Sequence, residues 1–299
     1  MTEFARGREG RCNIEVTAAP CAKPISGKTI RQFLKADITK CFYTYPLKIL
    51  TPTSSGNYCR WIYLVTYGGG LVPGDRLSAE VTVGEACCVL WTSQAFQKVY
   101  PCNDNKTTNF RISFSVSSFG LLCVLPDPVV CFKNANYNQE QDVFISSTSN
   151  LVFLDWLTSG RMARGERWEF TRLKTTLSVF LDSTLVFRDV LCLKNTSQLE
   201  LRTSMKQTNI VGFCFITGPD LRQFIEGILC DVGCRQAYGN SPSSDILMTV
   251  SPYYHQGSTD ISGCVIRFSG WETSKVMFQL EKLLQPIYPI LGGNPFYLK

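Results

Sequence analysis

Histidine is nearly missing from this sequence, since His255 is the single one among 299 residues. Chemistry that needs two imidazoles on one chain is therefore excluded, which removes multi-histidine zinc hydrolases, HExxH proteases and histidine-rich metal stores. Charge is also scarce, because charged residues make up 18% of the chain. The formal net charge of +6 is too small and too scattered to indicate a nucleic-acid-binding stripe, so we expect no nucleic-acid partner.

Long apolar runs are absent as well. No run approaches the roughly 18 to 20 residues that span a bilayer, and the first residues contain no apolar core of a secretory signal. We therefore expect no membrane segment and a cytoplasmic location. The 14 cysteines are fewer than a disulfide framework requires, which is about 8–10% of a chain. We expect them to be reduced thiols, many of them packed as small apolar residues.

Alternation of apolar and polar residues with period two dominates the chain and predicts β-strands. Turn signals separate these runs and favour an antiparallel sandwich, barrel or coil of sheets. Strands are predicted at residues 60–66, 77–83, 110–116, 129–132, 150–156, 166–173, 176–181, 184–193, 209–216, 246–250 and 264–268.

Two segments late in the chain have helical periodicity instead. Residues 220–230 and 273–285 place apolar residues at i, i+3, i+4 and i+7, the pattern of amphipathic helices. The sequence thus predicts a mainly β protein of the α+β class with two helices in the C-terminal third. No composition break marks a linker, so we predict one domain over residues 1–299, of which residues 1–11 form a mobile terminus.

The glycine-rich segment at residues 68–76 reads G-G-G-L-V-P-G-D-R. A phosphate-binding loop would end in Gly-Lys-Ser/Thr, and an aspartate in that place would repel phosphate. A dinucleotide site would need a helix after the glycines, whereas strands are predicted on both sides. The segment therefore indicates a tight connection between strands, in which glycines adopt positive φ.

Metal and nucleophile sites find few candidate residues. Cys230 and Cys234 resemble half of a zinc site, but only Cys264 and His255 are available to complete it. His255 would also have to serve any Cys–His nucleophile pair, and nothing in the sequence marks its cysteine. We predict no tight metal site.

Carboxylates are the remaining oxygen ligands. They could hold a divalent ion weakly, or several could form ion pairs with the arginines next to them in the sequence. The acids beside predicted turns or strand ends are Asp75, Asp127, Asp155, Glu166 and Asp189.

Four unusual segments follow one another along the chain. They read Y-L-V-T-Y-G-G-G-L-V-P-G-D-R-L at 63–77, T-S-Q-A-F-Q-K-V-Y at 92–100, L-P-D-P-V-V-C-F at 125–132 and G-R-M-A-R-G-E-R-W-E-F at 160–170. In content and order they resemble the motifs of the urease accessory protein D family, also called UreD or UreH. The resemblance also includes the chain length.

This resemblance implies a maturation factor and not an enzyme. Members of the family bind a helical partner, UreF, which recruits the GTPase UreG, and the assembly docks on apo-urease and delivers nickel to it. The family fold is an irregular, β-helix-like stack of many short strands with two late helices. Nickel is implied to be a transient cargo in a tunnel lined by carboxylates and backbone oxygens, with no tightly bound cofactor.

The resemblance also carries site residues over to this chain. Asp75 is the first candidate for a tunnel carboxylate, Glu166 is the second, and Ser93 belongs with them. The remaining motif residues are expected near the tunnel or in the core beneath it: Gly69, Gly70, Gly74, Lys98, Asp127, Gly160, Arg161 and Gly165. Alternatively, these residues form turns and a buried ion pair that fix the strand stack.

A second function class stays open from the sequence. A β-rich hydrolase acting on sugars, for example, would use two carboxylates held about 5–10 Å apart in a cleft. A structure separates the two interpretations, because the hydrolase needs paired acids in a cleft.

Overall fold

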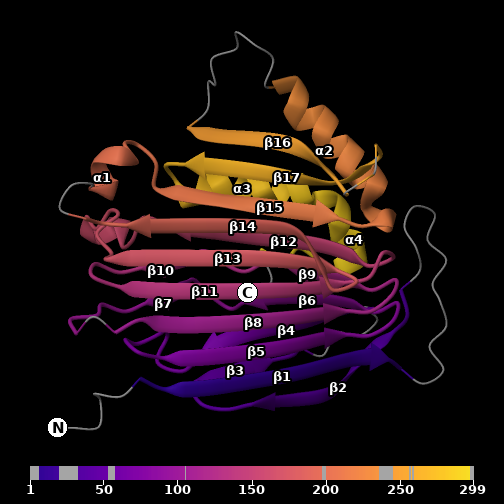
Figure 1. Cartoon of the computed structure of the whole chain (residues 1–299), viewed down its shortest axis with the longest axis horizontal. Helices are drawn as coiled ribbons and strands as arrows, with labels where there is room; N and C mark the ends of the chain where they lie inside the picture. Colours follow the sequence, from indigo (N-terminus) through magenta and orange to yellow (C-terminus); the bar gives the residue numbers. More distant parts are fainter. Residues whose placement is uncertain are drawn as a thin grey trace.

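The computed structural model describes residues 7–19, 33–52, 58–104, 106–196, 200–235, 245–255, 257 and 259–296. Two facing β-sheets form a stack that grows along the chain from the N-terminal strands at one end to the C-terminal strands at the other (Figure 1). We call them sheet A and sheet B. Their arrangement confirms the mainly β, β-helix-like fold that the sequence predicts.

Sheet A contains 7 strands and sheet B contains 10. In spatial order, sheet A is β14 (Thr184–Lys194), β13 (Arg172–Leu181), β11 (Asn136–Ile145), β8 (Thr108–Val116), β5 (Arg76–Val83), β1 (Glu9–Ala18) and β2 (Ala36–Tyr43). Sheet B is β16 (Ile246–Tyr254), β17 (Ile261–Gly270), β15 (Ile210–Thr217), β12 (Asn150–Thr158), β9 (Leu121–Val124), β6 (Cys88–Ser93), β4 (Cys59–Thr66) and β3 (Leu47–Leu50), with β7 (Gln97–Val99) and β10 (Val129–Cys131) alongside.

The central strands of both sheets run parallel, which corrects the antiparallel arrangement predicted above. From β4 to β13 the chain passes between the two sheets, so that β5, β8, β11 and β13 are parallel neighbours in sheet A. In sheet B the same holds for β4, β6, β9 and β12. Period-two alternation reports that a strand has one buried face, but it is the same for either strand direction.

The connections between strands are short at one end of the strands and long at the other. Short turns at residues 84–87, 117–120 and 146–149 link strands at one end. Longer loops at residues 67–75, 94–107, 125–135 and 159–171 link them at the other end, on the left in Figure 1. All four motif segments therefore reach the same end of the molecule.

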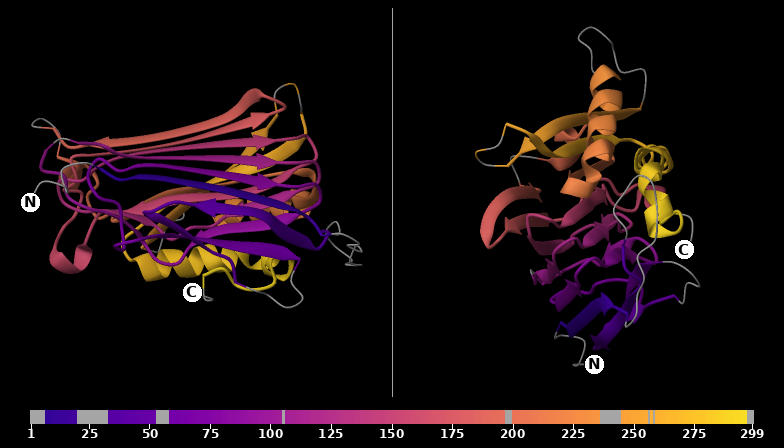
Figure 2. Two further views of the ribbon diagram at one scale, coloured as in Figure 1. Left: turned by 90° about the horizontal axis from the view of Figure 1, so that it is seen from below. Right: turned by 90° about the vertical axis from the view of Figure 1, so that its right-hand side faces the viewer.

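Two apolar cores hold the fold together. The first lies between the sheets, where Trp91 of sheet B meets Phe114 of sheet A with ring centroids 5.7 Å apart. The second lies between the outer face of sheet B and the helices α2 (Arg222–Arg235), α3 (Thr273–Leu284) and α4 (Tyr288–Leu291). Figure 2 shows α3 and α4 along one side of the stack. No helix in the described part of the chain is long and apolar enough to cross a membrane.

The two predicted helices are confirmed, with small changes at their ends. A 3-10 turn, η3 (Pro219–Leu221), precedes α2, and α3 ends at Leu284. The helix α4 and the short α1 (Leu201–Ser204) were not predicted, and neither were the 3-10 turns η2 (Met162–Arg164) and η4 (Gln285–Ile287). They are too short to show a helical stripe.

The strand predicted at residues 166–173 is wrong except for its last two residues. Gly165 and Trp168 have φ of 77° and 57°, which interrupts an extended chain. Trp168 and Phe170 nevertheless bury their side chains in the inner core. The Asn195 amide holds this segment by donating to the carbonyls of Trp168 and Phe170 at 2.6 and 2.7 Å.

The predicted mobile terminus at residues 1–11 is corrected for residues 7–11, whereas residues 1–6 lie outside the described residues. Strand β1 begins at Glu9 and pairs in parallel with β5 and antiparallel with β2. Cys12, Ile14 and Val16 are buried in the inner core. This alternation is visible in the sequence, and it is the signal that the prediction missed.

Candidate functional site

The four motif loops are stacked on one another by backbone hydrogen bonds. The Leu71 N–H donates to the Lys98 carbonyl, and the Tyr100 N–H donates to the Leu71 carbonyl, both at 2.8 Å. Strand β7 of the second motif pairs in parallel with β10 of the third. The Asn134 N–H then donates to the carbonyl of Glu169, in the fourth motif, at 3.0 Å. We call this assembly the loop stack.

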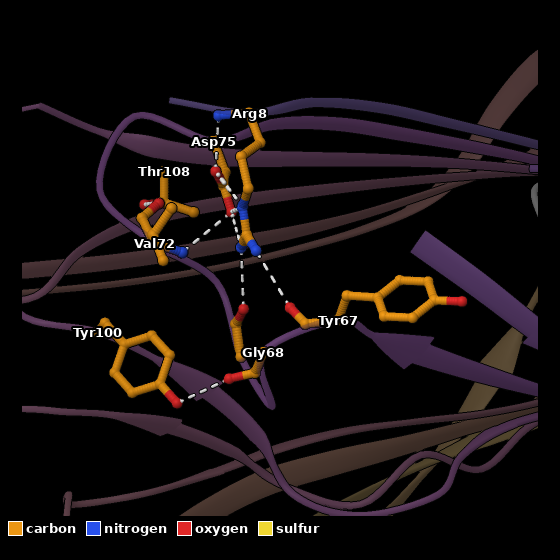
Figure 3. Close-up of polar contacts among 8 residues, drawn as sticks. Arg8, Tyr67, Gly68, Val72, Asp75, Tyr100 and Thr108 are labelled. Atoms are coloured by element: carbon orange, nitrogen blue, oxygen red, sulfur yellow. Dashed lines mark hydrogen bonds and ion pairs between the residues drawn. The ribbon is translucent and has the colours of Figure 1, made fainter. Parts of the chain in front are cut away.

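Asp75 fastens the glycine-rich loop to the N-terminal segment. Its side chain is fully buried and accepts hydrogen bonds from the backbone N–H of Arg8 at 2.8 Å and of Val72 at 2.9 Å (Figure 3). The Arg8 guanidinium also binds this carboxylate, with its Nε 3.0 Å from Oδ1. The ion-pair partner is thus Arg8, from the segment predicted to be mobile, and not the neighbouring Arg76.

Arg8 also holds the glycines of this loop. Its guanidinium donates to the carbonyls of Tyr67 and Gly70 at 3.1 and 3.0 Å. Gly69 and Gly74 have φ of 69° and 82°, which side chains rarely adopt. A Cβ on Gly70 would lie 2.8 Å from the Lys98 carbonyl oxygen. The loop is therefore the tight strand connection that the sequence indicates.

Ser93 and Asp127 join the second motif to the third. The Ser93 hydroxyl donates to Asp127 Oδ2 at 3.1 Å, and the Asp127 N–H donates to the Ser93 oxygen at 2.8 Å. Both residues are buried. Burial raises the pKa of the nearby Tyr63 hydroxyl, and the negative charge of Asp127 raises it further.

Arg161 and Glu166 form the ion pair proposed for the fourth motif. Arg161 Nε lies 2.8 Å from Glu166 Oε2, and a second bond joins the same two groups. This arginine holds the pKa of Glu166 below its usual value. The Arg161 guanidinium also stacks 4.1 Å from the ring centroid of Phe132 in the third motif. Gly160 and Gly165, with φ of 136° and 77°, shape the turn around this pair.

The predicted site residues therefore reach one end of the molecule but belong to separate clusters. Asp75, Ser93 and Glu166 each have their own partners, and Lys98 is exposed on β7. Their contacts agree with the alternative interpretation, in which these residues form turns and an ion pair that fix the strand stack. Their role in a nickel tunnel stays a prediction.

A buried polar cluster between the sheets was not singled out from the sequence. Asp155, on the inner face of β12, accepts hydrogen bonds from the Thr175 hydroxyl at 2.6 Å and from the Gln141 amide at 3.2 Å. Thr175 and Gln141 come from sheet A, so the cluster spans the interior. Tyr137 and Gln139 extend it along β11, joined by a hydrogen bond of 2.7 Å. Burial raises the pKa of Asp155 to about 6, although both hydrogen bonds favour its charged form.

This cluster continues toward the edge of the stack. Asp189 on β14 adds to the raised pKa of Asp155 through its negative charge. Asp189 is itself paired with Arg267 of β17, whose side chain is 57% exposed. We call the set Tyr137, Gln139, Gln141, Asp155, Thr175, Asp189 and Arg267 the interior polar row. It includes the buried Asp155 carboxylate and, at the edge where sheet A ends, the exposed side chain of Arg267.

The sequence contains two signals of this row. Strand β11 has polar residues on both of its faces, and Tyr137, Gln139 and Gln141 point inward. Because apolar and polar residues do not alternate along most of it, it was not predicted as a strand. Asp155 and Asp189 were predicted beside turns or strand ends, but both lie in the middle of strands. A lone acid inside an apolar strand is the feature that identifies Asp155.

Two of the candidate zinc residues, Cys230 and Cys264, differ in their burial. Cys264 is buried in the second core, whereas Cys230 is exposed on α2. In the part of the chain that the structure describes, no group of three or more His, Cys, Asp or Glu residues is placed to hold a metal. The side chain of Cys234 lies outside the described residues.

His255 lines a cavity of about 230 Å³ at the short-turn end. Tyr253, Arg222 and Ser262 share its wall with apolar side chains such as Phe215. No aspartate or glutamate lines it, so this cavity does not support a hydrolase with paired carboxylates.

These features define a two-sheet β-solenoid with stacked end loops and a polar row in its interior. The chain belongs to the UreD urease accessory protein family, whose model matches residues 30–299. It is 31% identical to urease accessory protein D of Oryza sativa subsp. japonica, over 96% of this chain and 99% of the relative. It is 30% identical to urease accessory protein UreD of Sorangium cellulosum, over 92% and 81%.

A third relative, urease accessory protein UreH of Helicobacter pylori, is 28% identical over 50% of this chain and 56% of its own. The resemblance read from the four motifs is thereby confirmed. Membership of this family supports a role in urease maturation. The relatives are named accessory proteins, which suggests a non-catalytic role.

Proposed function

We propose that this protein is a scaffold of urease maturation that conducts nickel toward apo-urease. In this proposal it binds a UreF-like protein, and through it the GTPase UreG, and the assembly docks on apo-urease in the cytoplasm. Nickel is the cargo and passes through the protein without a tight resting site. Family membership supports the assignment to urease maturation.

The interior polar row is the observation that carries the conduction step. A divalent cation crossing an apolar core would meet a large desolvation cost. The row replaces hydration by oxygen ligands, from the Asp155 carboxylate, the Thr175 hydroxyl and the Gln141 amide. Oxygen donors of this kind bind nickel more weakly than a cage of thiolates or imidazoles, so the ion can be released.

Asp155 suits this role better than Asp75 does. The Asp75 carboxylate is already neutralised by Arg8 and saturated by backbone donors. The Asp155 carboxylate accepts from two neutral groups and has no cationic partner in the described residues. Its charge is therefore available to an incoming cation.

The experiment compares Asp155→Asn with Asp142→Asn in the complex with the UreF-like protein of the same organism. Asn keeps an oxygen that accepts from Thr175 and Gln141, whereas the charge is lost. Asp142 lies on the outer face of β11 and serves as the matched control. We expect Asp155→Asn to lower the nickel content and activity of the matured urease at least about tenfold, because one charge in a dry interior governs cation entry.

Stoichiometric co-purification with the partner must stay unchanged in both variants. Equal nickel delivery by Asp155→Asn and wild type would refute conduction through the row. If the wild-type chain ignored both the UreF-like protein and apo-urease, the scaffold assignment itself would fail.

A further inference from the structure

The surface of the loop stack is rich in arginine and aromatic side chains. We call it the loop face and define it by Tyr67, Phe96, Lys98, Arg164, Arg167 and Trp271. Tyr67, Phe96 and Trp271 are 46%, 38% and 41% exposed. Its residues belong to the longer connections or, for Trp271, directly follow β17, and these connections lie on the left in Figure 1.

Cation–π contacts fix these groups at the surface. The Arg167 guanidinium lies 4.5 Å from the ring centroid of Trp271, and Arg8 lies 5.7 Å from that of Tyr45. Tyr45 in turn contacts the ring of Tyr67, with centroids 5.8 Å apart. Rigid arginine and aromatic side chains are the residue types enriched at the centres of protein interfaces, since they lose little conformational entropy on binding.

The free charge of the loop face is positive. Lys98 and Arg164 are exposed and take part in none of the salt bridges among the described residues, although the charge of Arg164 also lowers the pKa of Glu166. The acids of these loops that reach the surface are each paired with a cation, in the salt bridges Asp104–Lys106, Glu166–Arg161 and Glu169–Lys133. By contrast, the three short turns at the opposite end contain Glu85 and no lysine or arginine.

We infer that the loop face is the docking surface for an acidic protein surface, and, resting on the proposed function, that its occupant is apo-urease. The unpaired cations would meet the acidic groups of the partner, while the exposed rings supply buried contact area. A nucleic acid fits less well, because the paired acids among the cations would repel phosphates.

A helical partner also fits other surfaces better than the loop face. The apolar side of a helix packs into aliphatic surface. The exposed aliphatic side chains Leu185, Val190 and Leu247 lie on β14 and β16. The UreF-like protein is therefore not the expected occupant of the loop face.

The test uses the double variant Lys98→Glu/Arg164→Glu in complex with the UreF-like protein, titrated with apo-urease by biolayer interferometry. Lys35→Glu is the matched charge reversal, because Lys35 is exposed at the opposite end, next to Leu34, whose N–H donates to the Ala86 carbonyl of a short turn. We expect the double variant to bind apo-urease at least about tenfold more weakly at 0.1 M salt, since like charges across an interface are strongly unfavourable. Lys35→Glu is expected to bind as wild type does, and wild-type affinity is expected to fall with added salt.

The outcomes separate this inference from the proposed function. If the double variant binds apo-urease as wild type does, the loop face is not the docking surface and the scaffold assignment stands. If the double variant loses the UreF-like protein but still binds apo-urease, the occupant of the loop face is the UreF-like protein and not apo-urease. If the wild-type complex binds a mixed-sequence RNA and the double variant does not, the loop face binds nucleic acid and the inferred protein partner is wrong. If the wild-type complex does not bind apo-urease at all, the proposed docking step fails together with the inference.

Discussion

The contact between Arg8 and Asp75 allows a sharp test of how the motif loops are held. Substituting Asp75→Asn keeps the shape of the side chain but replaces one acceptor oxygen by an NH₂ group. That group must then face either the Val72 N–H or the Arg8 guanidinium, both of which are donors. The substitution therefore loses a charge-assisted hydrogen bond and creates a donor–donor contact.

The magnitude follows from the burial of the pair. The Asp75 side chain is 0% exposed and that of Arg8 is 16% exposed. Removing one partner of a buried ion pair costs about 3–5 kcal/mol. Arg8 keeps two carbonyl acceptors, at Tyr67 and Gly70, so we expect the lower end, about 3 kcal/mol of unfolding free energy.

The assay is urea unfolding at fixed pH, followed by tryptophan fluorescence. Arg8→Ala is expected to cost a similar amount, and the double variant Arg8→Ala/Asp75→Asn less than the sum of the two, because both remove the same interaction. Arg76→Ala is the control, since Arg76 is the adjacent arginine and is exposed at the start of β5. Additive effects of Arg8 and Asp75, or a loss at Arg76 as large as that at Arg8, would refute the reasoning.

Three further predictions concern titration and thiol access. Arg161 lowers the pKa of Glu166, so the pair stabilises the fold above the ordinary value of 4.5 and loses this effect as pH falls through the lowered pKa. Urea unfolding should thus show Glu166→Gln losing its disadvantage against wild type in acid, and a constant difference would contradict the pairing. The pKa of Asp155 is raised from 3.8 to about 6, so the wild type loses stability as pH rises from about 4 to about 6. Asp155→Asn cannot ionise and should therefore gain stability relative to wild type over this interval. An unchanged difference would place the carboxylate in water. Iodoacetamide followed by peptide mass mapping should label the exposed Cys192 in the native protein, whereas Cys88 should react only after unfolding, since it is buried and burial raises its pKa. Native labelling of Cys88 would contradict its place in the second core.

Local patterns in the sequence determined the fold class. Alternation with period two follows from the two faces of a strand, and the helical stripes of α2 and α3 follow from 3.6 residues per turn. Those patterns depend on neighbouring residues only, which is why they could be read without a structure. The glycines of the first motif likewise indicated a turn, because glycine tolerates positive φ wherever it stands in a chain.

Pairing between distant residues was decided by the tertiary structure alone. The contact of Asp75 with Arg8 joins segments that are far apart in the chain. The contacts of Asp155 with Thr175 and Gln141 join the two sheets. Strand direction likewise depends on how distant strands pair. The residues around an aspartate do not reveal whether its partner is the next residue or one 67 positions away, as Arg8 is from Asp75. The sequence could therefore propose which acids matter, but only the stacking of the two sheets determined which of them are saturated at the loop stack and which one remains without a cationic partner in the interior.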